Sequence, residues 1–283
     1  MRTATINARR LDRPVGDAST MRYCLTTASA THAGQIRQFN DDSVAHDPSV
    51  DAFVLADGMG GHNAGDVAAE MATRTVIERL AKGASRRDHA SERVREAVEE
   101  ANQAICRAAR TDSARTGMGT TLAIALFDES RVTIGHVGDS RVYRLREGRL
   151  KLLTRDHSVL QEQAETGMLD RESARVSQNR SLVTRALGAG YDATPEVNEF
   201  DVLPDDIILL CSDGLNDMVD DADIELTLAE IGCNLDMAAE MLVELANDNG
   251  GQDNISVLLV RVEGETQAAS GWRQRVFGWL RGA

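Results

Sequence analysis

The sequence predicts an α+β fold in which helices form layers against antiparallel sheets. Two long helical segments follow a first group of strands, four short strands then come in succession, and two more helical segments lie between the last strands. Such clustering is typical of α+β domains, whereas a parallel sheet would need strands and helices in alternation. No internal repeat or low-complexity linker interrupts residues 21–263, so we expect one domain there.

The strands are predicted from short apolar or alternating runs that end at turn residues. They comprise residues 22–28, 43–46, 53–56, 120–127, 131–137, 141–145, 150–153, 196–200, 206–211 and 255–262. If the second and third of these form a hairpin around Asp47-Pro48, the start of one strand and the end of the other share its open end. Asp42 and Asp57 would then face each other.

The helices are predicted from apolar residues that recur every three or four positions. They comprise residues 63–80, 88–110, 158–166, 222–231 and 235–247. The second of these follows the helical period most closely. Asn63 is expected to cap the first helix, because a side-chain oxygen there can accept a hydrogen bond from an unpaired N–H of the first turn.

Composition excludes some classes of protein. The 283 residues include 31 basic and 45 acidic side chains, which gives a net charge of −14. Such a charge argues against nucleic acid or an anionic membrane as the main partner. The cysteines Cys24, Cys106, Cys211 and Cys233 form no C-x-x-C pair, and we interpret them as buried free thiols of a reducing compartment. Without a membrane-length apolar run or a signal sequence, a cytoplasmic location is predicted.

The two ends of the chain differ from the domain. Residues 1–20 are polar and unpatterned, and we predict a disordered N-terminal tail. Residues 264–283 form an amphipathic C-terminal tail in which Trp272, Val276, Trp279 and Leu280 would share one helical face. Two interpretations stay open for this tail: it docks back on the domain, or it contacts a membrane surface or a partner.

Carboxylates recur at the ends of the predicted strands. They follow a strand at Asp57, Asp139 and Asp213, and they precede one at Asp253 and in Asn40-Asp41-Asp42. Each alone would be ordinary turn chemistry. In an antiparallel sheet, however, the end of one strand and the start of its neighbour lie at one edge, so several carboxylates would converge. Such a cluster could not stay ionised without cations, and all-oxygen ligands favour Mg²⁺ or Mn²⁺.

Six motifs carry a resemblance to a known family. They are Arg37-x-x-Asn-Asp-Asp42, Ala56-Asp-Gly-Met-Gly-Gly-His62, Gly117-Met-Gly-Thr-Thr121, Gly135-His-Val-Gly-Asp-Ser-Arg141, Ser212-Asp-Gly-Leu215 and Asp253-Asn-Ile-Ser256. In this order, over about residues 21–263, the chain resembles the bacterial type 2C metal-dependent Ser/Thr protein phosphatases, the PPM family. The resemblance implies a four-layer α-β-β-α sandwich of two antiparallel sheets flanked by helix pairs.

The resemblance also implies a set of metal ligands. These are Asp41, Asp42, Asp57, Gly58, Asp139, Asp213 and Asp253. Asp57 would bridge two Mn²⁺ or Mg²⁺ ions, with the Gly58 carbonyl on one ion and Asp213 and Asp253 on the other. Asp139, with Asp213, would serve a third, weaker site.

Asp41 and Asp42 would bind the ions directly or through water. The family usually has Glu where this chain has Asp41, and the shorter side chain leaves that contact open.

The implied reaction is hydrolysis of phosphoserine and phosphothreonine in proteins, in opposition to a Ser/Thr kinase. Asp57 and the ions would hold a hydroxide in line with phosphorus, and Arg37 would bind the phosphate oxygens with its planar fork of donors. His62, His157 and a metal-bound water are alternatives for the leaving-group acid.

Residues 154–193 correspond to the family's variable flap. Its candidate contacts to phosphopeptide are Arg171, Arg175, Arg180 and Arg185.

Two alternative functions stay open for the chain: a non-catalytic signalling module of the same fold, and a phosphohydrolase that acts on small molecules. We expect the protein to be a monomer.

Overall fold

The computed structural model describes residues 23–60, 64–83, 89–128, 130–166, 182–188, 190 and 192–264. The predicted N-terminal tail lies outside the described residues. So does the predicted C-terminal tail, apart from Gly264, which ends the last strand. No helix within the described ranges is long and apolar enough to cross a membrane.

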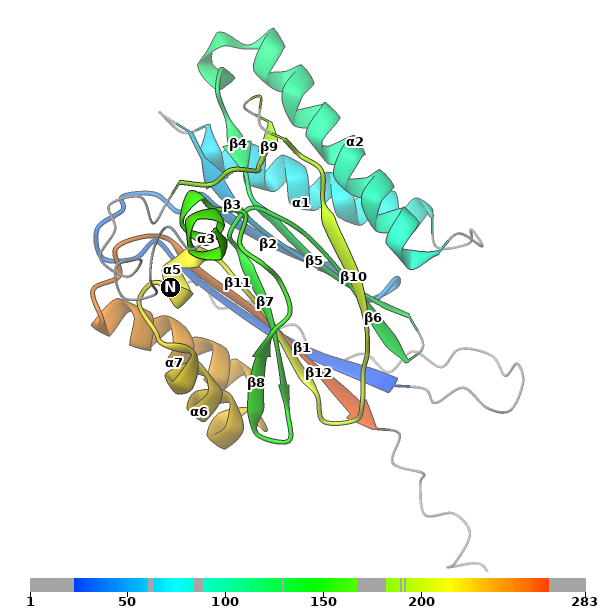
Figure 1. Cartoon of the computed structure of the whole chain (residues 1–283), viewed down its shortest axis with the longest axis vertical. Coiled ribbons are helices and arrows are strands. Elements are labelled where there is room, and N and C mark those ends of the chain that lie inside the picture. The colour runs from blue at the N-terminus through cyan, green and yellow to red at the C-terminus, as the bar shows by residue number, and fades with distance from the viewer. Residues whose placement is uncertain are drawn as a thin grey trace, which may run out of the picture.

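Two antiparallel sheets form the centre of the molecule (Figure 1). The first contains, in spatial order, β1 (Tyr23–His32), β12 (Ile255–Gly264), β11 (Ile207–Cys211), β7 (Arg141–Arg146) and β8 (Arg149–Leu152). The second contains β10 (Glu196–Asp201), β6 (Arg131–Val137), β5 (Leu122–Asp128), β3 (Ala52–Met59), β4 (Gly119–Thr120) and β9 (Leu187–Gly188), with β2 (Asp42–Asp47) also paired to β3.

Helices cover the outer face of each sheet (Figure 1). The second sheet packs against α1 (Gly65–Lys82) and α2 (Ala90–Thr111), and the first against α6 (Asp221–Ile231) and α7 (Leu235–Asp248). Shorter elements are η1 (Ser113–Arg115), α3 (Val159–Glu165) and α5 (Asp213–Asn216). The predicted four-layer α-β-β-α sandwich is confirmed.

The apolar strands are buried on both faces because successive side chains point in opposite directions. In β3, Phe53 and Leu55 join the core between the two sheets, whereas Val54 joins the core under α1 and α2. In β11, Ile208 likewise faces the other sheet, and Leu209 faces the helices α6 and α7. A strand buried in this way reads as a continuous apolar run.

Three local predictions were wrong. Strand β1 runs on past Ala28 to His32, because it stays paired with β12 along its whole length. Helix α1 begins at Gly65 after Ala64, which makes no side-chain cap, while Asn63 lies outside the described residues. All four cysteines are free thiols, but Cys211 alone is buried. Cys24 is exposed because it lies near the start of β1, opposite Glu263 at the end of β12.

Candidate metal centre

The predicted hairpin brings two carboxylates together. Strands β2 and β3 pair in the register that sets Asp42 opposite Asp57. The main chain of Asp57 is fixed from the neighbouring strands: its N–H donates to Thr121 Oγ1 (3.0 Å), and its carbonyl accepts from Thr121 N–H (2.9 Å) and Thr120 Oγ1 (2.8 Å). The Gly117–Thr121 motif therefore positions Asp57.

A cavity of about 230 Å³ lies at this edge of the two sheets. Among the residues that line it are Arg37, Asp41, Asp57, Gly58, Asp139, Asp213 and Asp253. The structure thus places every predicted site residue except Asp42 around one cavity.

Asp42 is the predicted site residue that does not line the cavity. Its Oδ2 accepts a hydrogen bond from Ser212 Oγ (2.8 Å), at the end of β11 in the opposite sheet. Burial raises the pKa of Asp42 to about 6, even though hydrogen bonds from Ser256 and Ser212 act in the opposite direction. Asp42 therefore joins the two sheets beneath the cavity and does not line it.

Asp41 and the Gly58 carbonyl converge at the start of α1. A Cβ added to Gly65 would lie 2.9 Å from Gly58 O and 3.0 Å from Asp41 Oδ2, so both oxygens face the same point. A Cβ added to Gly58 itself would lie 2.2 Å from Gly65 O. Only glycine fits at position 58, and this close approach leaves its carbonyl beside the Asp41 carboxylate.

Asp213 and Asp253 share an edge, as the antiparallel pairing predicts. Strands β11 and β12 are neighbours, and Ser212 N–H donates to Ser256 O (3.1 Å) between them. Asp213 is the first residue of α5, directly after β11. Asp139 reaches the same cavity from the turn between β6 and β7.

The local electrostatics fit a cation site. Burial, followed by the neighbouring carboxylates, raises the pKa of Asp57 and Asp213 well above the usual range, and burial raises that of Asp139 to about 7. Within the described residues, the Oδ1 atoms of Asp42 and Asp213 are buried without a hydrogen-bond partner. Clustered carboxylates are stable as anions only when opposite charge compensates them. An all-oxygen donor set of this kind suits Mg²⁺ or Mn²⁺.

Arg37 supplies a positive charge at the cavity wall. Its NH2 group lies 2.8 Å from Asp253 Oδ2, and its side chain is 57% exposed. The hydrogen bond to Asp253, with the attraction of that carboxylate, raises the pKa of Arg37. The guanidinium is therefore always charged and is reachable from solvent.

Sequence reasoning missed the role of Asn254. Its Oδ1 accepts the Asp41 N–H (2.8 Å), and its Nδ2 donates to the carbonyls of Phe39 (2.8 Å) and Ala33 (3.1 Å). One side chain thus fixes the loop that carries Arg37 and Asp41. The signal was present, because Asn254 follows Asp253 within a motif, but an amide gives no indication in sequence of which backbone groups it will bind.

The structure corrects one candidate acid. His157 is 7% exposed and does not line the cavity. Its Nδ1 accepts a hydrogen bond from Gly138 N–H (3.2 Å), and burial lowers its pKa to about 4. Its two ring nitrogens face the Gly138 N–H and Glu196, which leaves neither of them directed at the cavity, so the structure does not support this interpretation.

The remaining candidates fall partly outside the described residues. His62 lies outside them, as do Arg171, Arg175 and Arg180 of the predicted flap. Arg185 pairs with Asp192 (3.7 Å).

A second, larger cavity of about 470 Å³ adjoins the first and shares Asp139 and Asp213 with it. Asp217, Asp220 and Asp221 add to its acidic lining. The negative field of the metal centre thus extends along one side toward α6.

The family model for protein phosphatase 2C matches residues 28–249. The chain belongs to the protein phosphatase 2C family. This protein phosphatase 2C is 38% identical over 238 residues to the serine/threonine phosphatase stp of Listeria monocytogenes, covering 81% of this chain and 93% of the relative. It is 36% identical over 240 residues to the serine/threonine protein phosphatase PstP of Mycobacterium tuberculosis, covering 84% of this chain and 45% of that longer protein.

Solved structures of relatives have the same fold. The crystal structure of the Mycobacterium tuberculosis phosphatase PstP/Ppp matches this protein phosphatase 2C with a TM-score of 0.77 and 36% identity, covering 84% of this chain and 99% of the other. The catalytic domain of PstP in complex with two manganese ions matches with a TM-score of 0.75 and 34% identity, covering 86% and 100%. The predicted resemblance to bacterial members of the family is confirmed.

Proposed function

We propose that this protein phosphatase 2C hydrolyses phosphoserine and phosphothreonine in proteins at the carboxylate-lined cavity. It is a metal-dependent serine/threonine protein phosphatase, as its family and its relatives establish. The observation that supports this location is the convergence of Asp57, Asp139, Asp213 and Asp253 with Arg37 on one wall. Both sheets of the fold contribute to that convergence.

Two divalent ions, Mn²⁺ or Mg²⁺, would be held by Asp57 together with the Gly58 carbonyl, Asp213 and Asp253. PstP binds two manganese ions in its catalytic domain, which supports the same cofactor here. Asp139, with Asp213, is the proposed ligand set of a third, weaker ion. When bound, such ions activate water and offset the charge of the phosphate.

Asp41 lies on the cavity wall, so its shorter side chain still presents an oxygen beside the Gly58 carbonyl. Asp42 would act through water or through its hydrogen bond to Ser212, since it does not line the cavity.

The chain's own residues bind and orient the substrate. The Arg37 guanidinium lies at the wall, where its planar fork can donate two parallel hydrogen bonds to phosphate oxygens. Asp253 holds that fork in place through one N–H and leaves the others available. With His157 excluded, His62 and water are the proposed sources of the leaving-group proton.

The phosphatase domain is proposed to span residues 21–263, and its partners to be phosphorylated Ser/Thr proteins and the kinase that modifies them. The net charge of −14 disfavours nucleic acid. The free thiols support a reducing, cytoplasmic setting. We further propose that the protein is a monomer. Its C-terminal tail, residues 264–283, is proposed to contact a membrane surface or a partner.

Hydrolysis assays test this function directly. Phosphate release from a phosphothreonine peptide should need Mn²⁺ and should exceed release from p-nitrophenyl phosphate and from nucleotides. Asp57→Asn should lower kcat by at least about 100-fold, because the site loses one of the charges that would hold the ions. Asp128→Asn, at the far end of β5, is the matched control and should retain activity.

Two other outcomes would replace the proposal. Faster turnover of nucleotides would identify a small-molecule phosphohydrolase. No turnover of any substrate by the manganese-loaded protein would identify a non-catalytic signalling module.

A further inference from the structure

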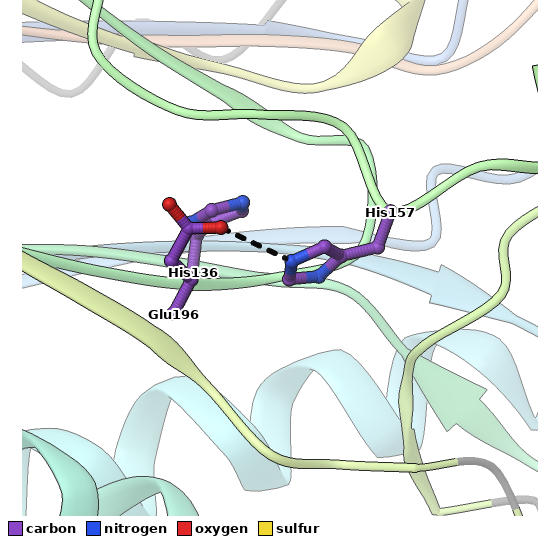
Figure 2. A group of neighbouring side chains, drawn as sticks. All are labelled: His136, His157 and Glu196. Atoms are coloured by element: carbon purple, nitrogen blue, oxygen red, sulfur yellow. Dashed lines mark ion pairs between the residues drawn. The ribbon is translucent and has the colours of Figure 1, made fainter. Parts of the chain in front are cut away.

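Two histidines and a glutamate form a cluster, His136, His157 and Glu196 (Figure 2). His136 lies on β6 and Glu196 lies opposite it on β10, while His157 comes from the segment before α3. The two imidazole rings stack with their centroids 4.5 Å apart and 16° between their planes. His136 is 1% exposed and His157 is 7% exposed. None of the three residues lines the cavity that contains Asp57.

The cluster could be taken for a metal site, because one potential ligand atom from each residue lies within 4.8 Å of the others. The hydrogen bonds of His157 argue otherwise. Its Nδ1 accepts the Gly138 N–H (3.2 Å), so in the neutral ring Nε2 carries the proton. That Nε2 faces Glu196 Oε2 at 3.7 Å (Figure 2). A protonated nitrogen has no lone pair for a metal, and no other lone pair of the ring is left.

His157 instead holds the peptide that leads into the metal centre. Its main-chain N–H donates to Gly138 O (2.8 Å) while its side chain accepts from Gly138 N–H, so one residue binds both polar groups of Gly138. Gly138 has a φ of +105°, and a Cβ there would lie 2.7 Å from Thr121 Cγ2. The next residue is Asp139, which lines the cavity.

The same residue reaches a second part of the wall. The carbonyl of His157 accepts the Thr184 N–H (2.8 Å). Val183, directly before Thr184, lines the cavity together with Asp139. His157 therefore connects two parts of the wall that are about forty residues apart in the chain.

We infer that His157 is a positioning residue of the metal centre, in which an unprotonated Nδ1 fixes the Gly138–Asp139 peptide and so directs the Asp139 carboxylate into the cavity. The inference deepens the proposed function and rests on it, because Asp139 is there a ligand of the third, weaker ion. His157 itself touches neither substrate nor ion.

A pair of amide substitutions isolates the Nδ1 contact. In His157→Asn the side-chain oxygen can occupy the place of Nδ1 and accept from Gly138 N–H, whereas in His157→Gln the amide reaches the place of Nε2. Calorimetry with Mn²⁺ should show near wild-type uptake for His157→Asn. For His157→Gln, the Mn²⁺ affinity of the weakest site should fall by about 5-fold, as expected for loss of one hydrogen bond. The kcat for phosphopeptide should fall in parallel, while KM stays within about 2-fold of wild type, because the phosphate contacts of Arg37 are unchanged.

Glu196→Gln is the control, because it leaves the Gly138 contacts in place, and its Mn²⁺ uptake should match wild type. Thermal unfolding of each variant separates misfolding from a local effect. Equal Mn²⁺ uptake by His157→Asn and His157→Gln would overturn the inference. So would zinc uptake that Glu196→Gln abolishes, since the cluster would then be a metal site.

Nitrogen-15 NMR of the unsubstituted protein tests the same point without a variant. The imidazole shifts should show the Nε2–H tautomer of His157, and a scalar coupling should join its Nδ1 to the Gly138 amide. An Nδ1–H tautomer would overturn the inference. If the inference fails alone, Asp57→Asn still lowers the kcat of manganese-dependent hydrolysis by at least about 100-fold. If the proposed function fails, the wild-type protein itself shows no hydrolysis.

Discussion

Asp42 and Asp57 lie opposite each other in one hairpin, yet only Asp57 lines the cavity. The difference arises from the residues that contact each of the two aspartates. Thr120 and Thr121 bind the main chain of Asp57, whereas Ser212 binds the carboxylate of Asp42 itself. Identical side chains at paired positions thus have different chemistry, because their partners decide which carboxylate faces the cavity.

Arg37 is the residue whose role can be tested most directly at this scale. Arg37→Ala should lower kcat/KM for a phosphothreonine peptide by about 10- to 100-fold, since hydrogen bonds to a charged group contribute about 1.5–3 kcal/mol. Arg37→Lys should recover only part of the loss, because a single ammonium cannot make the bidentate contact. Arg110→Ala, on the exposed side of α2, is the matched control. Equal values of kcat/KM for Arg37→Ala and wild type would show that Arg37 does not bind the phosphate.

The elements position the site through close packing between layers. Strand β6 approaches α2 so closely that a Cβ at Gly135 would lie 2.4 Å from Val94 Cγ1. The strand ends at Val137, directly before the Gly138–Asp139 turn, so any shift of β6 also moves Asp139, which lines the cavity. Glycine at position 135 therefore serves the site as well as the packing of α2.

Gly135→Ala should destabilise the protein by about 1–3 kcal/mol, as overpacking of a buried interface does. Urea unfolding measures the change in the free energy of unfolding. The double variant Gly135→Ala with Val94→Ala should be more stable than the sum of the two single changes predicts, because the smaller side chain at position 94 makes room for the new methyl group. Additive effects would show that these two residues do not contact each other.

The molecule as a whole accumulates negative charge where its sheets meet. Asp57 comes from the second sheet and Asp213 from the first, and burial together with the neighbouring carboxylates raises the pKa of each. The fold thus places repulsive groups close together in a setting where bound cations compensate them.

Without metal, stability should fall as pH rises. An aspartate has an ordinary pKa near 3.8, whereas the folded values are about 6 for Asp42 and about 7 for Asp139. At pH values between the ordinary pKa and these raised pKa values, the folded state binds more protons than the unfolded state. The free energy of unfolding therefore decreases with increasing pH in this range. Thermal unfolding in EDTA should therefore give a lower Tm at pH 8 than at pH 5.5.

Manganese should reverse this trend, because it binds the deprotonated carboxylates. Its stabilisation should be larger at pH 8 than at pH 5.5. Asp139→Asn should flatten the decline seen in EDTA, since it removes one of the responsible groups. A Tm in EDTA that rises from pH 5.5 to pH 8 would contradict the expected origin of the repulsion.

The sequence by itself determined the layers and most of the site. Apolar runs such as residues 53–56 and 206–211 identify strands buried on both faces, and an Asp at the end of each predicts a shared edge once antiparallel pairing is assumed. The structure confirms the facing pair of Asp42 and Asp57. These features depend on neighbouring residues or on a regular spacing along the chain, and for that reason they can be recognised in the sequence.

Only the tertiary structure decided which polar groups meet across the chain. Asn254 binds the loop of residues 33–41 from more than two hundred residues away, and His157 faces Gly138 and away from the cavity. Hydrogen bonds have direction and short range, so the partner of a side chain depends on coordinates that spacing does not encode. The ends of strands are visible in sequence, whereas the contacts that aim each carboxylate exist only once the two sheets are packed together.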